Sequence, residues 1–429
     1  MLTTILVPIV LMALIFALLN VPLYAIILTA ALYLQYFIND VPLAAVFTGM
    51  VESITKTSLM AVPFFVLAGG LIQASSLGTR LITVFAVTLQ NIRGGLSIAC
   101  LLSNAFFGAI SGSAPAAVAT FSKIIYVPME KAYGERLSLG MLTSSGALST
   151  IIPPSITMII FGVATETSVA DLFMCGIFPG LLIVVVVATY LFIKGGTNTA
   201  VAVTGDDGKT PLPSMARAWF KGIPVLVLPV LILGGIYSGV CTPTEAGAIA
   251  ALYGLIVPII FLRDISVTKV PAILLDSIKI TAQIFILVAA SITFAQAATM
   301  AQLPQLLYHV LSDLNYYTFF LFLNVLLLIV GCFFEPGAAV LILAPLLLPT
   351  ARALGIDLLH LGIVFTVNLS IGMFTPPFGL NIFVVQSVLK KSAGIVARSV
   401  GPFIAMYILC LLAITYIPQI ALFLPRLMH

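Results

Sequence analysis

Charged side chains are scarce in this sequence of 429 residues. Asp, Glu, Lys and Arg make up 7% of the chain, against about 25% in an average soluble domain. The mean hydropathy is +1.23, and 18 basic and 14 acidic side chains are too few to cover a protein of this size in water. This composition excludes a soluble globular protein. A net charge of +4 is also too small and dispersed to indicate nucleic-acid binding.

Histidine and cysteine are also few, and neither is grouped into a motif. The three His residues form no H-E-x-x-H pattern, and the five Cys residues contain no C-x-x-C pair. The sequence therefore predicts no metal cluster of His and Cys and no disulfide. Because it also lacks the His/Asp/Glu cluster of an intramembrane enzyme, we expect no enzymatic activity. The first 20 residues lack the Lys or Arg that begins a secretory signal, so we expect a retained first span.

Long, continuous apolar runs fill most of the chain. A spanning helix needs about 20 apolar residues, and continuous rather than alternating runs favour helices over a β-barrel. We therefore predict an all-α polytopic membrane protein. The ten predicted spans are 4–19, 22–38, 58–76, 138–165, 170–193, 223–241, 244–262, 278–299, 358–389 and 395–418.

Two further apolar stretches, 94–127 and 316–350, are interrupted near their middles. The first break is Ser-Gly-Ser-Ala-Pro at 111–115, and the second is Phe-Glu-Pro-Gly at 334–337. Each stretch is long enough for about one and a half crossings. We therefore predict two re-entrant helical hairpins, each of which enters and leaves on the same side.

The distribution of basic residues supports this topology. With both stretches re-entrant, 15 Lys and Arg residues fall on one side and three on the other, so the first side is predicted to be cytoplasmic. Ten spans then place both termini in the periplasm. The polar stretch 195–214 becomes a cytoplasmic loop, and 215–221 is predicted to be a short interfacial helix. Residues 40–57 are either a second such helix or a polar loop. The cytoplasmic set is Arg80, Arg93, Lys123, Lys131, Arg136, Lys194, Lys209, Arg217, Lys221, Arg263, Lys269, Lys279, Lys390, Lys391 and Arg398; the other is Lys56, Arg352 and Arg426.

Helix-breaking residues recur at a fixed offset. A shift of 221 residues places Pro115 on Pro336, and a shift of 223 places the Pro153-Pro154 pair on Pro376-Pro377. Each half therefore has a helix, a broken hairpin, a helix interrupted by Pro-Pro and a further helix. Because five crossings separate the two starts, the repeats are predicted to be inverted, as in secondary transporters with discontinuous helices.

Hydroxyl groups and glycines precede both Pro-Pro pairs, and no charge accompanies them. Freed backbone carbonyls and hydroxyl oxygens at these breaks suit a hard monovalent cation such as sodium. Helix N-termini at the hairpin tips suit an anionic substrate. Glu335 is the only carboxylate at a predicted tip, which makes it a candidate functional residue. Glu245, in contrast, forms a predicted capping box with Thr242.

Three motifs together resemble the large membrane subunit of tripartite ATP-independent periplasmic (TRAP) transporters. They are Ser-Gly-Ser-Ala at 111–114, Thr-Pro-Thr-Glu-Ala at 242–246 and Gly-Met-Phe-Thr-Pro-Pro-Phe-Gly at 372–379. The resemblance covers essentially the whole chain. The family usually has aspartate at the second tip, where this chain has Glu335.

The resemblance implies a sodium-driven importer of carboxylates in the bacterial inner membrane, with an elevator-type fold and mechanism. It implies two protein partners: a small four-helix membrane subunit on a separate chain and a soluble periplasmic substrate-binding protein. Family substrates include C4-dicarboxylates and sialic acids, and the whole chain is most similar to the sialic acid branch.

We expect one sodium site in each repeat, where a hairpin tip faces the broken helix of the same repeat. The first set of expected ligands is Ser111, Gly112, Ser113, Gly146, Ser149 and Thr150. The second set is Gly331, Gly337, Gly372, Met373 and Thr375. Ser111, Ser113, Ser155, Glu335 and Asn381 are the expected substrate-binding residues.

The predicted organisation has four parts: scaffold helices and an interfacial arm at 1–57, a first transport repeat at 58–194, a loop with scaffold helices at 195–276, and the inverted repeat at 277–429. A binding-protein-independent divalent-anion/sodium symporter has a similar architecture, and a passive channel is the alternative of another class.

Overall fold

The computed structural model of the chain describes residues 21–195, 213–311 and 314–428, with residues 7–9, 11–12, 15–16 and 18–19 before them. These residues contain many helices and no β-strand, which confirms the predicted all-α class. The predicted first span, 4–19, is described only in these short pieces, and the predicted polar loop, 195–214, lies largely outside the described residues.

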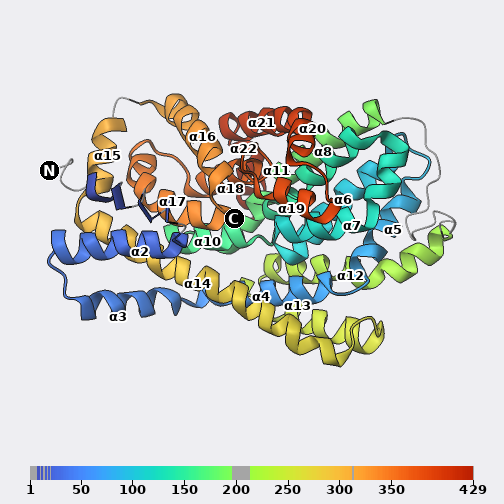
Figure 1. The fold of residues 1–429 in the computed structure, drawn as a ribbon, viewed down its shortest axis with the longest axis horizontal. Coiled ribbons are helices and arrows are strands. Elements are labelled where there is room, and N and C mark those ends of the chain that lie inside the picture. Colours follow the sequence, from blue (N-terminus) through green and yellow to red (C-terminus); the bar gives the residue numbers. More distant parts are fainter. Residues whose placement is uncertain are drawn as a thin grey trace.

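One layer of helices forms the lower part of the molecule in Figure 1. The long helix α14 packs against α2, α3 and α4, and α13 packs against both α4 and α12. The stretch 40–57, which the sequence leaves open between an interfacial helix and a polar loop, contains the helix α3. The members of this lower layer are α2 (Leu23–Tyr33), α3 (Leu43–Ile54), α4 (Ala61–Gln73), α12 (Met215–Tyr237), α13 (Pro243–Ile256) and α14 (Val270–Met300).

The upper part contains both hairpins, both interrupted helices and the C-terminal helices (Figure 1). Its first-repeat members are α6 (Gly95–Ser111), α7 (Ala114–Tyr133), α8 (Glu135–Ser145), α9 (Leu148–Ile151), α10 (Ile156–Thr165) and α11 (Val169–Lys194). Its second-repeat members are α16 (Tyr316–Phe333), α17 (Pro336–Ala353), α18 (Leu358–Gly372), α19 (Leu380–Leu389), α20 (Ala393–Ser399), α21 (Gly401–Tyr416) and α22 (Gln419–Met428).

The hairpin breaks occur at the predicted positions. Gly112 ends α6 with a φ of 58°, a left-handed conformation that glycine adopts without steric cost. Glu335 is the N-cap of α17, directly before Pro336. Both second arms run farther than predicted, to Tyr133 and Ala353, because the prolines inside them do not end the helix.

Each Pro-Pro pair interrupts a helix in the structure. Pro153-Pro154 and Pro376-Pro377 are both joined by cis peptide bonds. The segments on either side of the first pair meet at 41°, and an irregular stretch from Met373 to Gly379 separates α18 from α19. Proline lacks the backbone N–H that a continuous helix needs, so both breaks follow from the sequence.

Three details of the fold differ from the sequence predictions. The helices α5 (Leu77–Thr88) and α15 (Leu303–Leu311), which precede the hairpins, are absent from the predictions because they are too short to register as spans. The predicted interfacial helix 215–221 is not separate but forms the start of α12. Gly222, which follows the predicted end of that short helix, lies within α12 and close to α5, where a Cβ would lie only 2.3 Å from the Val84 side chain.

Helix length alone does not distinguish spans from hairpin arms. Six helices of the described residues are long and apolar enough to cross a membrane, or up to nine if each of three bent helix pairs is one span. Two of the six are α16 and α17, the arms of the second hairpin. The residues at the hairpin tips and the distribution of Lys and Arg are therefore needed to distinguish spans from hairpin arms.

Candidate functional site

The first hairpin tip is built from Ser111, Gly112 and Ser113. The N–H of Ser113 donates to Ser111 Oγ at 3.5 Å, which closes a small turn. The tip lies against α4 of the lower layer, where a Cβ on Gly69 would lie 2.9 Å from the Ser111 Cα. The absence of a side chain at Gly69 thus allows the tip to approach this helix closely.

The first broken helix lies directly beside the same hairpin. A Cβ on Gly108 of α6 would lie 2.2 Å from the Cα of Ser149, and Ser149 Oγ donates to the Asn104 carbonyl at 3.2 Å. A Cβ on Gly146 would lie 3.1 Å from the Ala114 carbonyl, at the start of α7. The structure thus brings Gly146 and Ser149 to the first hairpin, close to its tip.

Thr150 and Ser155 form hydrogen bonds across the first Pro-Pro pair. Ser155 Oγ donates to the Thr150 carbonyl at 2.5 Å and accepts from the N–H of Met158 at 3.5 Å, as the N-cap of α10. Both residues are buried. Ser155, an expected substrate ligand, therefore has a visible structural role in this conformation.

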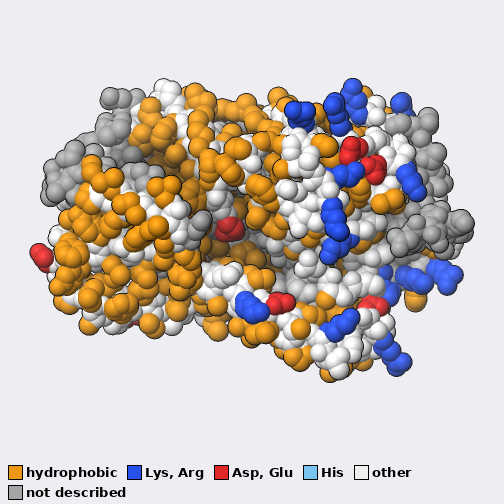
Figure 2. Space-filling view, viewed as in Figure 1, with side chains coloured by type: hydrophobic (Ala, Val, Ile, Leu, Met, Phe, Trp, Pro, Cys, Tyr) orange, Lys and Arg blue, Asp and Glu red, His pale blue; other side chains and the backbone are white. Residues whose placement is uncertain are grey.

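The second tip carries the one carboxylate expected there. The Glu335 side chain is exposed, and its Oε2 accepts from the N–H of Ala338 at 3.2 Å. Figure 2 shows a hollow near the centre of the molecule with an acidic side chain inside it. A carboxylate at the first turn of a helix is favoured by the helix dipole, which accounts for the local geometry.

The second broken helix contacts the second hairpin through its backbone. A Cβ on Gly372 would lie 2.3 Å from the carbonyl carbon of Gly331, so the two glycines allow direct contact between α18 and α16. Thr375 Oγ1 donates to the Ile371 carbonyl at 2.7 Å. The Met373 carbonyl accepts from the N–H of Asn381 at 2.8 Å. The structure thus brings Gly331, Gly372 and this irregular stretch together, whereas Gly337 of the same expected set lies against Ile160 and Glu335.

Asn381 connects the two repeats. Its Nδ2 donates to the Thr143 carbonyl of α8 at 3.2 Å, and a Cβ on Gly146 would lie 3.2 Å from the same nitrogen. The side chain is fully buried, and its Oδ1 has no hydrogen-bond partner among the described residues. A buried amide oxygen without a partner is a candidate ligand for a bound group.

The helices after the two breaks cross over to the opposite repeat. The first half of each broken helix packs against the hairpin of its own repeat, as expected. The second halves exchange hairpins, because α10 packs against α17 and α19 packs against α7. This crossed pairing is not evident from the sequence.

Both tips contact one helix, α10. A Cβ on Gly112 would lie 3.1 Å from Ile156 Cγ1, and a Cβ on Gly337 would lie 2.7 Å from Ile160 Cδ1. Ile156 and Ile160 are four residues apart and therefore share one face of α10. The N-terminus of α7 lies beside that of α10, and the N-terminus of α17 lies about one turn farther along it.

The groups gathered here are neutral oxygen donors with one carboxylate. Hydroxyl and carbonyl oxygens suit a hard cation such as sodium. The described residues contain no group of three His, Cys, Asp or Glu side chains that would hold a transition metal. The donor set therefore fits the expected cation, and the paired helix N-termini fit an anion.

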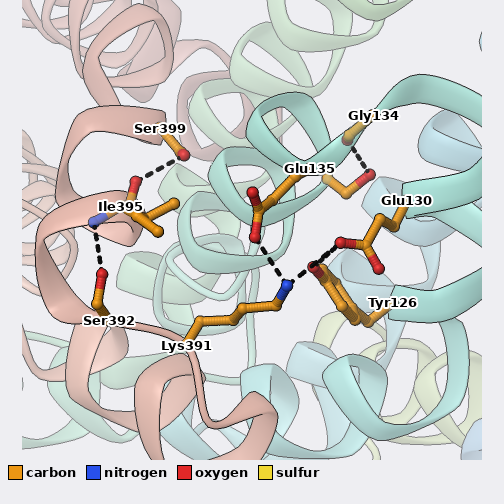
Figure 3. A network of polar contacts seen from close by, with 9 residues as sticks. Tyr126, Glu130, Gly134, Glu135, Lys391, Ser392, Ile395 and Ser399 are labelled. Carbon is orange, nitrogen blue, oxygen red and sulfur yellow. Dashed lines mark hydrogen bonds and ion pairs between the residues drawn. The ribbon is translucent and has the colours of Figure 1, made fainter.

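A charged cluster that the sequence analysis does not predict joins the same helices farther from the tips (Figure 3). Lys391 Nζ lies 2.7 Å from Glu135 Oε1 and 3.3 Å from Glu130 Oε1. The hydroxyl of Tyr126 donates to Glu130 Oε1 at 2.5 Å. This Lys391 cluster connects the segment after α19 to the end of α7 and the start of α8. Spacing does not reveal this cluster, because Lys391 lies more than 250 residues after its partners Glu130 and Glu135.

Comparison with known proteins identifies one family and several relatives that belong to it. The family described as "Tripartite ATP-independent periplasmic transporter, DctM component" matches residues 9–420. The chain is 38% identical over 378 residues to the C4-dicarboxylate TRAP transporter large permease protein DctM of Pseudomonas aeruginosa, covering 87% of this chain and 88% of that protein. It is 35% identical over 378 residues to the ectoine/5-hydroxyectoine TRAP transporter large permease protein UehC of Ruegeria pomeroyi, covering 87% of each.

A solved structure shares the fold. The crystal structure of the YdaH transporter of Alcanivorax borkumensis, described as having an unusual topology, superimposes with a TM-score of 0.63. The match covers 87% of this chain and 88% of that chain at 13% sequence identity, so the similarity concerns the fold alone.

Proposed function

Because this chain belongs to the DctM-component family of tripartite ATP-independent periplasmic transporters, we propose that it imports a carboxylate substrate by coupling its movement to sodium. The chain is the large, multi-pass permease of such a transporter. The observation that carries the proposal is the convergence of both hairpin tips on α10, next to two helix breaks rich in neutral oxygens.

The carboxylate would bind where the helix N-termini converge. The starts of α7, α10 and α17 each carry a partial positive charge from the helix dipole, and Gly112 and Gly337 hold two of them against α10. Ser111, Ser113 and Asn381 offer further polar groups nearby. N-acetylneuraminate is the first substrate to test, on the resemblance described above, beside a C4-dicarboxylate and ectoine.

Sodium would occupy one site in each repeat. Ser111, Gly112, Ser113, Gly146, Ser149 and Thr150 would supply the first, and Gly331, Gly337, Gly372, Met373 and Thr375 the second. Neutral ligands leave the charge of the ion uncompensated. Each ion would therefore attract the carboxylate, and the bound carboxylate would in turn favour sodium binding.

An elevator motion would move the upper part against the lower layer. The lower layer contains α2, α3, α12, α13 and α14, and α4 joins it although the proposed boundary at residue 58 assigns α4 to the first transport repeat. The hairpins and broken helices pack chiefly with one another. This division suits a body that moves as a unit against a static scaffold.

The topology proposal places both termini in the periplasm and the basic end in the cytoplasm. Figure 2 shows Lys and Arg gathered toward the right-hand end of the molecule, where α8, α12 and α20 lie. Five ion pairs between described residues join groups that the proposed topology puts on the same side, such as Lys56–Glu166 outside and Arg80–Asp264 inside. These pairings support the proposal.

Uptake by proteoliposomes tests the function. The vesicles would contain this chain with a small membrane subunit, and labelled substrate would be supplied with or without sodium and with or without a periplasmic binding protein. Uptake should require both sodium and the binding protein. Sodium-driven uptake without the binding protein would indicate the symporter alternative. Uptake that only equilibrates substrate across the membrane, without sodium, would indicate a passive channel.

A further inference from the structure

The two broken helices touch through a pair of buried hydroxyl groups. Thr150 Oγ1 lies 2.6 Å from Ser370 Oγ, although the two residues are 220 positions apart. Thr150 is 4% exposed and Ser370 is fully buried, so water does not compete for the contact. Thr150 lies three residues before the first Pro-Pro pair, and Ser370 lies six before the second. The contact therefore joins the two segments that carry the proposed sodium ligands.

The two hydroxyl groups make three hydrogen-bond contacts but have only two protons to donate. Thr150 Oγ1 also lies 2.9 Å from the Ala147 carbonyl, and Ser370 Oγ lies 2.6 Å from the Thr366 carbonyl. Each hydroxyl has one proton to donate. Three contacts thus share two protons, and the hydroxyl that donates across the repeats releases the carbonyl of its own helix.

Sodium at the first site would fix this arrangement. An ion bound to Thr150 Oγ1 occupies an oxygen lone pair and makes the hydroxyl proton a stronger donor. That proton would then point to Ser370 Oγ, and Ser370 would donate to the Thr366 carbonyl. This orders the end of α18, where Gly372 contacts Gly331 two residues after Ser370. Gly372 and the adjacent Met373 belong to the second proposed site.

We propose that Ser370 is a positioning residue that couples the two sodium sites, so that filling one site raises the affinity of the other. This inference rests on the proposed function, because it requires both sites. The coupling free energy is reciprocal, so either site can be filled first. Asn381 adds a second connection, since it bonds to the Met373 carbonyl and to the Thr143 carbonyl of the first repeat.

Equilibrium binding of radioactive sodium to the purified chain tests the coupling without any substrate. Wild type should bind two ions with a Hill coefficient approaching about 2, the limit for two coupled sites. Ser370→Ala should still bind two ions, with a Hill coefficient reduced toward about 1, because only the Asn381 connection remains. Ser370→Thr keeps the hydroxyl and should restore cooperativity. Ser370→Cys, which keeps the side-chain size but bonds weakly, should resemble Ser370→Ala.

Ser103→Ala is the matched control, because Ser103 is equally buried and its hydroxyl donates to the Ala99 carbonyl of its own helix. It should retain the wild-type Hill coefficient. Unchanged cooperativity in both Ser370→Ala and Ser370→Cys would overturn the coupling, as would a wild-type Hill coefficient of 1. The absence of saturable sodium binding to wild type would instead contradict the proposed function itself.

Discussion

At the scale of single residues, hydrogen bonds distinguish the side chains that stabilise the interrupted helices at the Pro-Pro pairs from those that can still bind a ligand. Ser155 caps α10 and donates to the Thr150 carbonyl. Thr375 donates its one proton to the Ile371 carbonyl but keeps oxygen lone pairs. Asn381 keeps an unpaired buried oxygen. The last two therefore remain the stronger candidates for direct binding.

Thr375→Ala should weaken sodium binding at the second site. The change removes one hydroxyl ligand and leaves the backbone nearly unaltered, and such a loss typically costs about 1 kcal/mol, or about fivefold in affinity. Uptake measured against sodium concentration should give a higher half-saturation value, and the apparent substrate affinity should fall with it. An unchanged sodium dependence in a normally inserted variant would count against this site.

Lys391→Met should lower the thermal unfolding midpoint. It leaves Glu130 and Glu135 without their shared cation, whereas Lys390→Met, at the exposed neighbouring position, should change the midpoint little. The carboxylate of Glu135 raises the pKa of Lys391 above its ordinary value. The ammonium therefore stays charged at neutral pH, and its contribution should be lost only as the pH rises through that raised pKa. Equal midpoints for the two variants would contradict a stabilising role.

At the scale of helices, the sequence predicts breaks better than partners. Proline and glycine act on their own backbone, so the tips at Gly112 and Glu335 and both Pro-Pro interruptions are predictable. The crossed packing of α10 and α19 depends on contacts between distant segments, and no local pattern encodes it. The Thr150–Ser370 contact has the same origin, since neither hydroxyl differs in sequence from its many neighbours.

Two glycines at the second hairpin should respond differently to substitution by alanine. In Gly337→Ala, the new methyl would meet the flexible ends of two side chains, Ile160 Cδ1 at 2.7 Å and Glu335 Oε2 at 2.9 Å, and overpacking of this kind costs about 1–3 kcal/mol. Ile160→Val removes the closer of these two contacts and should restore most of the unfolding midpoint and of uptake. Gly372→Ala would collide with the backbone of Gly331, which cannot yield, so Ile160→Val should not rescue it. If Ile160→Val rescued both Gly337→Ala and Gly372→Ala, or rescued neither, the result would contradict the contact of the second tip with α10.

At the scale of the whole molecule, the orientation of the two repeats decides the mechanism. Inverted repeats present their hairpins to opposite sides of the membrane, which allows access to alternate between them. Two exposed residues of the second arms report these sides: Lys123, in the middle of α7, and Arg352, near the end of α17.

Cysteine labelling in intact cells tests this orientation. In a background with Cys241 changed to serine, since the other native cysteines are buried, an impermeant reagent should label Arg352→Cys from the periplasm. Lys123→Cys should react only after the cytoplasmic side is opened. Labelling of both positions from one side would refute the inverted arrangement.

The length of α14 has a consequence for the lipids that this protein requires. From Lys279 to Met300 the helix rises about 32 Å, at about 1.5 Å per residue, which matches a hydrocarbon thickness of about 30 Å. We therefore expect the exposed Asp276–Lys279 pair to lie at one hydrocarbon boundary, with the preceding turns of α14 beyond it. Longer acyl chains would draw this pair into hydrocarbon or force the helix upright. Uptake should thus be fastest in vesicles of one acyl-chain length and decline in thicker bilayers, and Asp276→Leu with Lys279→Leu should flatten that dependence. An identical thickness profile in the double variant would show that α14 does not set the match.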